Sequence, residues 1–84
     1  MDNETLSRAI DKAIGDELRG LRGKRRMTRE ELKALTGLGI STIQRFENGE
    51  GSPSLQQLGR ILQALNMPMR QFLDLALRDI EGVE

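Results

Sequence analysis

The sequence predicts an all-α protein, a compact bundle of five helices, and three observations support this expectation. Apolar residues recur three and four positions apart along most of the chain, which is the period of an amphipathic helix. Thr28 and Ser54 each precede Glu or Gln by three positions, the pattern of a helix capping box. Glycine, Asn-Gly and proline interrupt the helical stretches, so the connections are short.

The composition bounds the chemistry. The 84 residues suffice for one domain with a small interior, for which a helical bundle is the usual solution. Cysteine and histidine are absent, which removes disulfides, thiolate metal sites and the commonest general base. Adjacent acids such as Asp16-Glu17 diverge on a helix, and no glycine-rich phosphate loop follows a strand. We therefore expect no enzyme activity, no cofactor and no metal.

The expected location is the cytoplasm. No apolar run approaches the length of a membrane span, and no signal peptide is recognisable. The only aromatic residues are Phe46 and Phe72, too few for a surface that stacks single-stranded bases. We expect a soluble protein that does not bind membranes.

Residues 4–25 are expected to form one long helix, capped by Asp2 or Asn3. Its apolar stripe consists of Leu6, Ile10, Ile14, Leu18 and Leu21. A break near Gly15 is one possibility, since glycine weakens a helix interior by about 1 kcal/mol relative to alanine. The early part of the stripe, Leu6 and Ile10, either covers the core or contacts a second subunit, and the stripe alone leaves both possibilities open.

The stretch from Thr28 to Gly49 is expected to form two short helices joined by a tight turn. In the first helix, Thr28 and Glu31 form the capping box, and Leu32 and Leu35 form an apolar edge. Gly37 can adopt positive φ at little cost and ends this helix.

The second helix of this stretch is expected to begin at Gly39 and end at Asn48-Gly49. Ile43 and Phe46, three positions apart, form its inner face. The residues between them point outward and are mostly polar, namely Ser41, Thr42, Gln44 and Arg45. A short helix with a buried edge and a donor-rich outer face suits the major groove of DNA.

Two more helices complete the bundle. Ser54 and Gln57 cap a helix to about Leu65, whose inner stripe is Leu55, Leu58, Ile61, Leu62 and Leu65. Pro68 can occupy the first turn of the last helix, whose stripe is Met69, Phe72, Leu73, Ala76, Leu77 and Ile80, with Leu75 off the stripe. Leu73, Leu77 and Ile80 are candidates for a two-fold dimer interface. The alternative is that all of them are core.

With its flanks, the stretch from Thr28 to Gly49 resembles the helix-turn-helix of the Cro/Xre, lambda-repressor-like family. The matching residues are Leu18-Arg19, Leu21-Arg22, Thr28, Glu30-Glu31-Leu32, Gly37, Ser41-Thr42-Ile43, Phe46-Glu47-Asn48-Gly49, Pro53-Ser54-Leu55 and Ala64-Leu65. Three departures are Lys33 for the usual Ala, Thr36 for the usual Leu, and Gly39-Ile40 for a Ser cap and polar reader. The resemblance divides the chain into a helical arm (1–14), a DNA-binding core (15–67) and a C-terminal helix expected to dimerise (68–84).

The resemblance also implies roles for individual residues. Arg22 is expected to form a structural salt bridge with Glu47. In the recognition helix, at about 40–48, Arg45 can bind guanine, Gln44 adenine and Ile40 a thymine methyl, and the base-reading set is Ile40, Ser41, Gln44 and Arg45. Phosphate contacts are expected from Arg29, Thr42, Lys24, Arg25 and Arg26.

The charge distribution agrees with this expectation although the formal net charge is zero. Residues 19–33 carry seven basic side chains and two acidic ones. Residues 1–18 carry two basic and five acidic side chains, and residues 71–84 carry Arg78 against Asp74, Asp79, Glu81 and Glu84. The centre of the chain is therefore positive and its ends are negative.

We therefore expect a sequence-specific, dimeric DNA-binding transcriptional regulator. The resemblance implies a small bacterial or phage repressor that reads an inverted repeat in double-stranded DNA, and it does not separate a repressor from a restriction–modification controller or an antitoxin. The alternative is an interaction module, antitoxin-like or coactivator-like, that holds a protein partner through the apolar C-terminal helix.

Overall fold

The computed structural model describes residues 2–80 and 82, and it confirms the all-α prediction. The helices are α1 (Asn3–Lys24), α2 (Arg29–Thr36), α3 (Ile40–Glu47), α4 (Leu55–Ala64) and α5 (Met69–Leu77). The part of the chain that the structure describes contains no strand. Glu81 and Glu84, two of the predicted acidic residues at the C-terminal end, lie outside the described residues.

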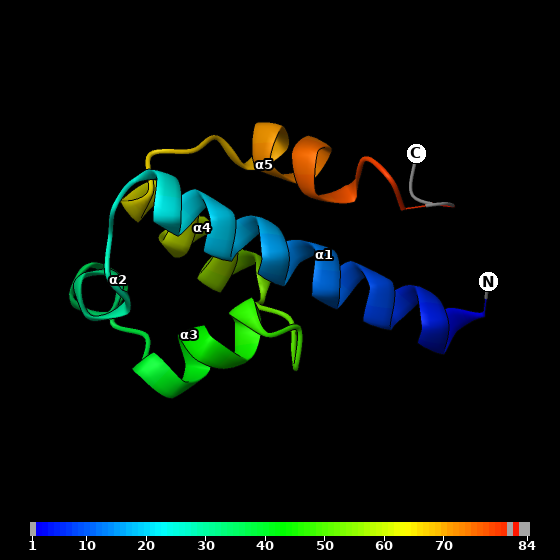
Figure 1. Ribbon diagram of the computed structural model, residues 1–84, viewed down its shortest axis with the longest axis horizontal. Coiled ribbons are helices and arrows are strands. Elements are labelled where there is room, and N and C mark those ends of the chain that lie inside the picture. The colour runs from blue at the N-terminus through cyan, green and yellow to red at the C-terminus, as the bar shows by residue number, and fades with distance from the viewer. Residues whose placement is uncertain (1, 81, 83–84) are drawn as a thin grey trace.

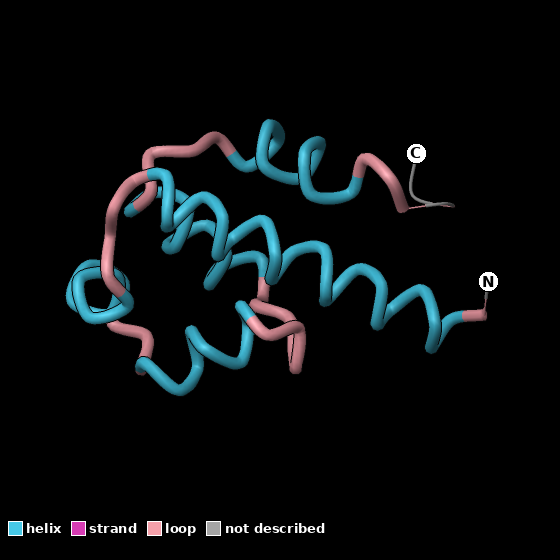
Figure 2. The backbone as a smooth tube through the Cα atoms, in the orientation of Figure 1, coloured by secondary structure: helices cyan, strands magenta, loops and turns pink. Residues whose placement is uncertain are grey.

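Helix α1 is the axis of the molecule (Figure 1). It packs against α3 on one side and α5 on the other, while α2 packs against α3 and α4. The N-terminal half of α1 projects beyond α3 (Figure 1), and the loops that join the helices are short (Figure 2).

The predicted caps are present. The Thr28 hydroxyl accepts a hydrogen bond from the Glu31 N–H at 3.0 Å, and the Glu31 carboxylate accepts one from the Thr28 N–H at 3.0 Å. The Thr28 N–H also lowers the pKa of Glu31 below its usual value. Ser54 and Gln57 form the second box, and Gly37 ends α2 at φ 76°. These local signals fix where α2 and α4 begin.

Helix α1 runs through Gly15 without a break, so the break considered from the sequence is wrong. The reason for glycine is close packing, because a Cβ at Gly15 would lie 2.3 Å from the Phe46 carbonyl oxygen. Asp2 caps the helix by accepting the Thr5 N–H at 2.8 Å, and this bond lowers the pKa of Asp2. Because Gly15 has no side chain, the backbone of α3 can pack directly against α1.

The core is closely packed and contains a void of only about 10 Å³. Its buried apolar residues come from every helix and from the turn before α3: Ile14, Leu18, Leu21, Leu32, Leu38, Ile43, Phe46, Leu58, Ile61, Leu62, Leu65 and Phe72.

Three sequence expectations about packing are wrong. Leu35 and Leu55, placed on inner stripes, are exposed by 64% and 69%. In α2 the buried partner of Leu32 is Thr36, whose hydroxyl donates to the Leu32 carbonyl at 2.7 Å and accepts the Leu38 N–H at 3.2 Å. Leu55 lies in the first turn of α4 and points outward. The last helix ends at Leu77, so Ile80 follows a turn and is half-buried.

Candidate nucleic-acid interface

Helix α3 has one buried and one exposed face. Ile43 and Phe46 are 2% and 3% exposed and anchor the helix to the core. Ser41, Gln44 and Arg45 are exposed, while Ile40 and Thr42 are half-buried at its edges. The side chains expected to face DNA therefore share one accessible surface.

Glu47 joins three helices at the end of α3. Its carboxylate, 2% exposed, accepts two parallel hydrogen bonds from Arg22 of α1, from Nε at 2.7 Å and from Nη2 at 3.0 Å. This is the pair that the sequence resemblance implied. The Glu47 hydrogen bond raises the pKa of Arg22 above its usual value, and Arg22 also donates to the Met27 carbonyl at 3.0 Å. The fork geometry fixes the angle between α1 and α3.

Arg29 also contacts Glu47, which the sequence analysis did not predict. Its Nε and Nη2 lie 3.1 and 3.0 Å from Glu47 Oε1. The side chain is 31% exposed, so part of the guanidinium still faces solvent. A guanidinium has five N–H donors, and the bonds to Glu47 leave donors for a phosphate. No spacing rule in the sequence could have found this contact, because it joins helices across a turn.

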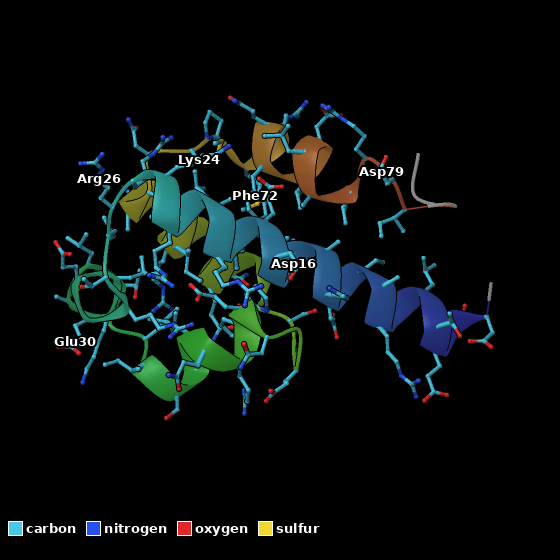
Figure 3. All side chains as sticks on the ribbon, viewed as in Figure 1. Asp16, Lys24, Arg26, Glu30, Phe72 and Asp79 are labelled. Atoms are coloured by element: carbon cyan, nitrogen blue, oxygen red, sulfur yellow. The ribbon has the colours of Figure 1, made fainter. Side chains whose placement is uncertain are left out.

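The expected phosphate residues Lys24, Arg25 and Arg26 are not brought to the α3 face. Arg25 Nε donates to the Leu65 carbonyl at 2.8 Å, which ties it to the end of α4. In Figure 3, Lys24 and Arg26 lie at the C-terminal end of α1 on the side that carries α5. The chain turns at Arg26, which has φ 55°, on its way from α1 to α2.

The candidate interface residues on and after α5 keep part of their surface accessible. Phe72 is fully buried, whereas Leu73, Leu77 and Ile80 are half-buried. Leu75, off the predicted stripe, is 37% exposed. Phe72 thus closes the core, and Leu73 and Leu77 pack against it while part of their surface stays accessible.

None of the helices among the described residues combines the length and the hydropathy needed to cross a lipid bilayer.

Comparison with known proteins agrees with this architecture. A family model for a helix-turn-helix domain matches residues 13–74. The HTH-type transcriptional repressor RghR of Bacillus subtilis is 33% identical over 57 residues, which are 67% of this chain and 42% of that repressor. The chain therefore spans about two fifths of its relative's length.

A solved structure shares the fold. The crystal structure of the clp gene regulator ClgR from C. glutamicum superposes with a TM-score of 0.79, covering 84% of this chain and 91% of that one. At 22% sequence identity, this likeness concerns the arrangement of the helices.

Proposed function

Because this chain belongs to the helix-turn-helix domain family of DNA-binding regulators, we propose that it is a sequence-specific transcriptional repressor that binds DNA as a homodimer. The observation that carries the proposal is the exposed polar face of α3 on a helix locked in place by Glu47. Its matched relative is a transcriptional repressor. Such a protein meets its operator in the cytoplasm of a bacterial cell.

Base reading is assigned to α3. Arg45 is exposed and can donate two hydrogen bonds to guanine, and the neighbouring exposed Gln44 can bind adenine. Ile40 offers an apolar contact to a thymine methyl. The Ser41 hydroxyl can form a hydrogen bond with several different bases. A helix with these four residues on one face discriminates among base pairs in the major groove.

Backbone contact is assigned to Arg29 and Thr42. Arg29 lies in the first turn of α2, where it shares its guanidinium between Glu47 and solvent. Thr42 is half-buried at the edge of α3. Such contacts position the reading helix without selecting a sequence. Lys24, Arg25 and Arg26 are left out of the proposed set, because Arg25 donates to the Leu65 carbonyl at the end of α4 and its neighbours lie beside it.

The dimer is proposed to form through α5. Leaving the half-buried strip of Leu73, Leu77 and Ile80 in water exposes contiguous apolar surface, which soluble monomers tend to avoid. Pairing the strip with itself about a two-fold axis covers it. To read both half-sites, the two α3 helices of such a dimer have to lie one turn of DNA apart, about 34 Å. An inverted repeat is the matching DNA site.

Selection from random double-stranded DNA, followed by sequencing, tests the proposal. The wild-type protein should enrich an inverted repeat and bind it with a steep dependence on salt, because phosphate contacts release counterions. Sedimentation should give a dimer at micromolar concentration. Absence of enrichment together with a flat salt dependence would contradict DNA binding and favour the protein-interaction module.

A further inference from the structure

An open hollow of about 410 Å³ lies where α1 crosses the end of α3. One wall is a stripe of α1 that presents Arg8, Lys12 and Arg19, with Asp16 between the last two. The opposite wall is Asn48-Gly49, directly after the reading helix. In Figure 3, Asp16 marks this stretch of α1, above the loop that follows α3.

We infer that this hollow, formed by Arg8, Lys12 and Arg19 on α1 and by Asn48-Gly49, is a second binding surface for DNA phosphates. The inference rests on the proposed function, since it assumes that α3 lies in a major groove. It assigns a role to the N-terminal half of α1. Arg8 and Lys12 precede residues 13–74, which match the helix-turn-helix family, so this part of the surface belongs to the extension of α1.

The surface is fixed relative to α3. Gly49 has φ 72°, and a Cβ there would lie 3.0 Å from the Lys12 Cα, so the loop backbone packs directly on α1. Three residues after Gly49, the Ser52 hydroxyl donates a hydrogen bond to Asp11, the residue before Lys12. Gly15, in the middle of α1, and Arg22, near its end, contact the C-terminal end of α3. The stretch of α1 that carries these cations is therefore held against the end of the reading helix.

The position suits the DNA backbone. A helix in the major groove has a phosphodiester strand on each side. Arg29, in the first turn of α2, is proposed to contact the phosphates of one strand. The loop after α3 lies toward the other strand, but it carries the acidic Glu50 and is a poor phosphate ligand by itself. The hollow supplies positive charge at this second strand.

The present ion pairs of the stripe are weak competitors for a phosphate. Arg8 pairs with Glu4, and Lys12 Nζ pairs with Asp16 at 2.9 Å, with both cations about three quarters exposed. Exposed pairs of this kind contribute about 0–1 kcal/mol, and a phosphate contact adds counterion release. Arg19 lies 3.6 Å from the same Asp16, so one acid is shared by two bases. Glu47, at the rear of the hollow, is occupied by Arg22 and Arg29.

The test is an R8Q/K12Q double variant, measured for binding to a random 30-base-pair duplex and to the site selected by the wild-type protein. The slope of log affinity against log salt should become shallower by about one for each lost contact per subunit, and binding to both duplexes should weaken by the same factor. Unchanged circular dichroism and thermal melting would show that the fold is intact.

The matched control is Arg78→Gln, at the residue that follows α5. Arg78 forms the same kind of exposed pair, four residues from Asp74, but on the other side of α1. This variant should leave the salt slope unchanged. Asp16→Asn should strengthen binding to both duplexes, because it frees Lys12 and Arg19 from their shared acid.

The outcomes separate this inference from the proposed function. If wild-type binding is steep in salt and R8Q/K12Q has the slope and affinity of the Arg78→Gln control, the second phosphate surface does not exist. If the wild-type protein itself has a flat slope, the proposed function fails and this inference fails with it. Loss of specificity without a change in slope would also overturn the assignment to phosphates.

Discussion

The two sides of α1 are held by different chemistry. On the α3 side, the backbones meet at Gly15 and a buried carboxylate accepts hydrogen bonds from Arg22 and Arg29. On the α5 side, Phe72 is fully buried and Leu73, Ala76 and Leu77 pack against the core. Within the described residues, no hydrogen bond or ion pair joins α1 to α5.

This difference corresponds to what each helix is proposed to do. Directional contacts with narrow geometry determine the angle of α3, which a base-reading helix needs because hydrogen bonds to base edges tolerate little displacement. Apolar contacts on the α5 side are non-directional. They attach α5 to the core and leave apolar surface available for a second copy.

Removing the Glu47 carboxylate should have the largest effect on the α3 side. Glu47→Ala leaves two arginines without their shared partner, and breaking a buried pair costs about 3–5 kcal/mol of unfolding free energy. Chemical denaturation measures this loss. Glu50→Ala, an exposed acid three residues away, should stay within about 0.5 kcal/mol of wild type. Equal effects of the two substitutions would mean that Glu47 does not anchor α3.

A methyl group at Gly15 should have the next largest effect. Gly15→Ala places a Cβ against the Phe46 carbonyl and should reduce the unfolding free energy by about 1–3 kcal/mol through overpacking. Gly20→Ala in the same helix meets nothing within 4 Å and should stabilise the protein by up to about 1 kcal/mol. Opposite shifts in melting temperature would establish that α1 and α3 meet closely. A stabilising Gly15→Ala would contradict that packing.

On the α5 side, Leu77→Glu should alter assembly more than folding. Leu77 is only half-buried, so the loss of unfolding free energy should be about 1 kcal/mol, part of the value of a fully buried leucine. Like charges across the two-fold axis should yield a folded monomer in sedimentation, with much weaker operator binding.

Leu75→Glu is the control for this substitution, since Leu75 lies off the strip. It should leave the dimer intact. The dimer would be refuted if the wild-type protein sediments as a monomer and one protein molecule binds each operator. Leu73 and Leu77 would then contribute to the core and to no interface.

Local signals made most of the fold predictable. A capping box needs only residues three positions apart, so Thr28 and Ser54 marked the starts of α2 and α4. Leu35 was misplaced because Thr36 occupies the buried position, where its hydroxyl is satisfied by the Leu32 carbonyl and the Leu38 N–H. Residue hydrophobicity does not reveal a buried polar group that finds its partners locally.

The candidate site was only partly predictable. The exposed face of α3 follows from helical periodicity, which is a local property. The contact between Arg29 and Glu47 and the reversal at Arg26 depend on how separate elements meet, so a run of basic residues did not show which of them point toward α3. The basic residues of this run lie in different places: Arg29 lies beside α3, whereas Arg25 forms a hydrogen bond with the end of α4.

The measurement that tests the account most directly compares the sequences selected from random DNA by the wild-type protein and by Arg45→Ala. Arg45 is exposed on the helix that Glu47 holds, so its loss should leave the fold unchanged. We predict that binding to the selected site weakens by about 1–3 kcal/mol and that preference is lost at one base pair of each half-site, with the other positions retained. Identical preferences for the two proteins would contradict base reading by Arg45 on α3.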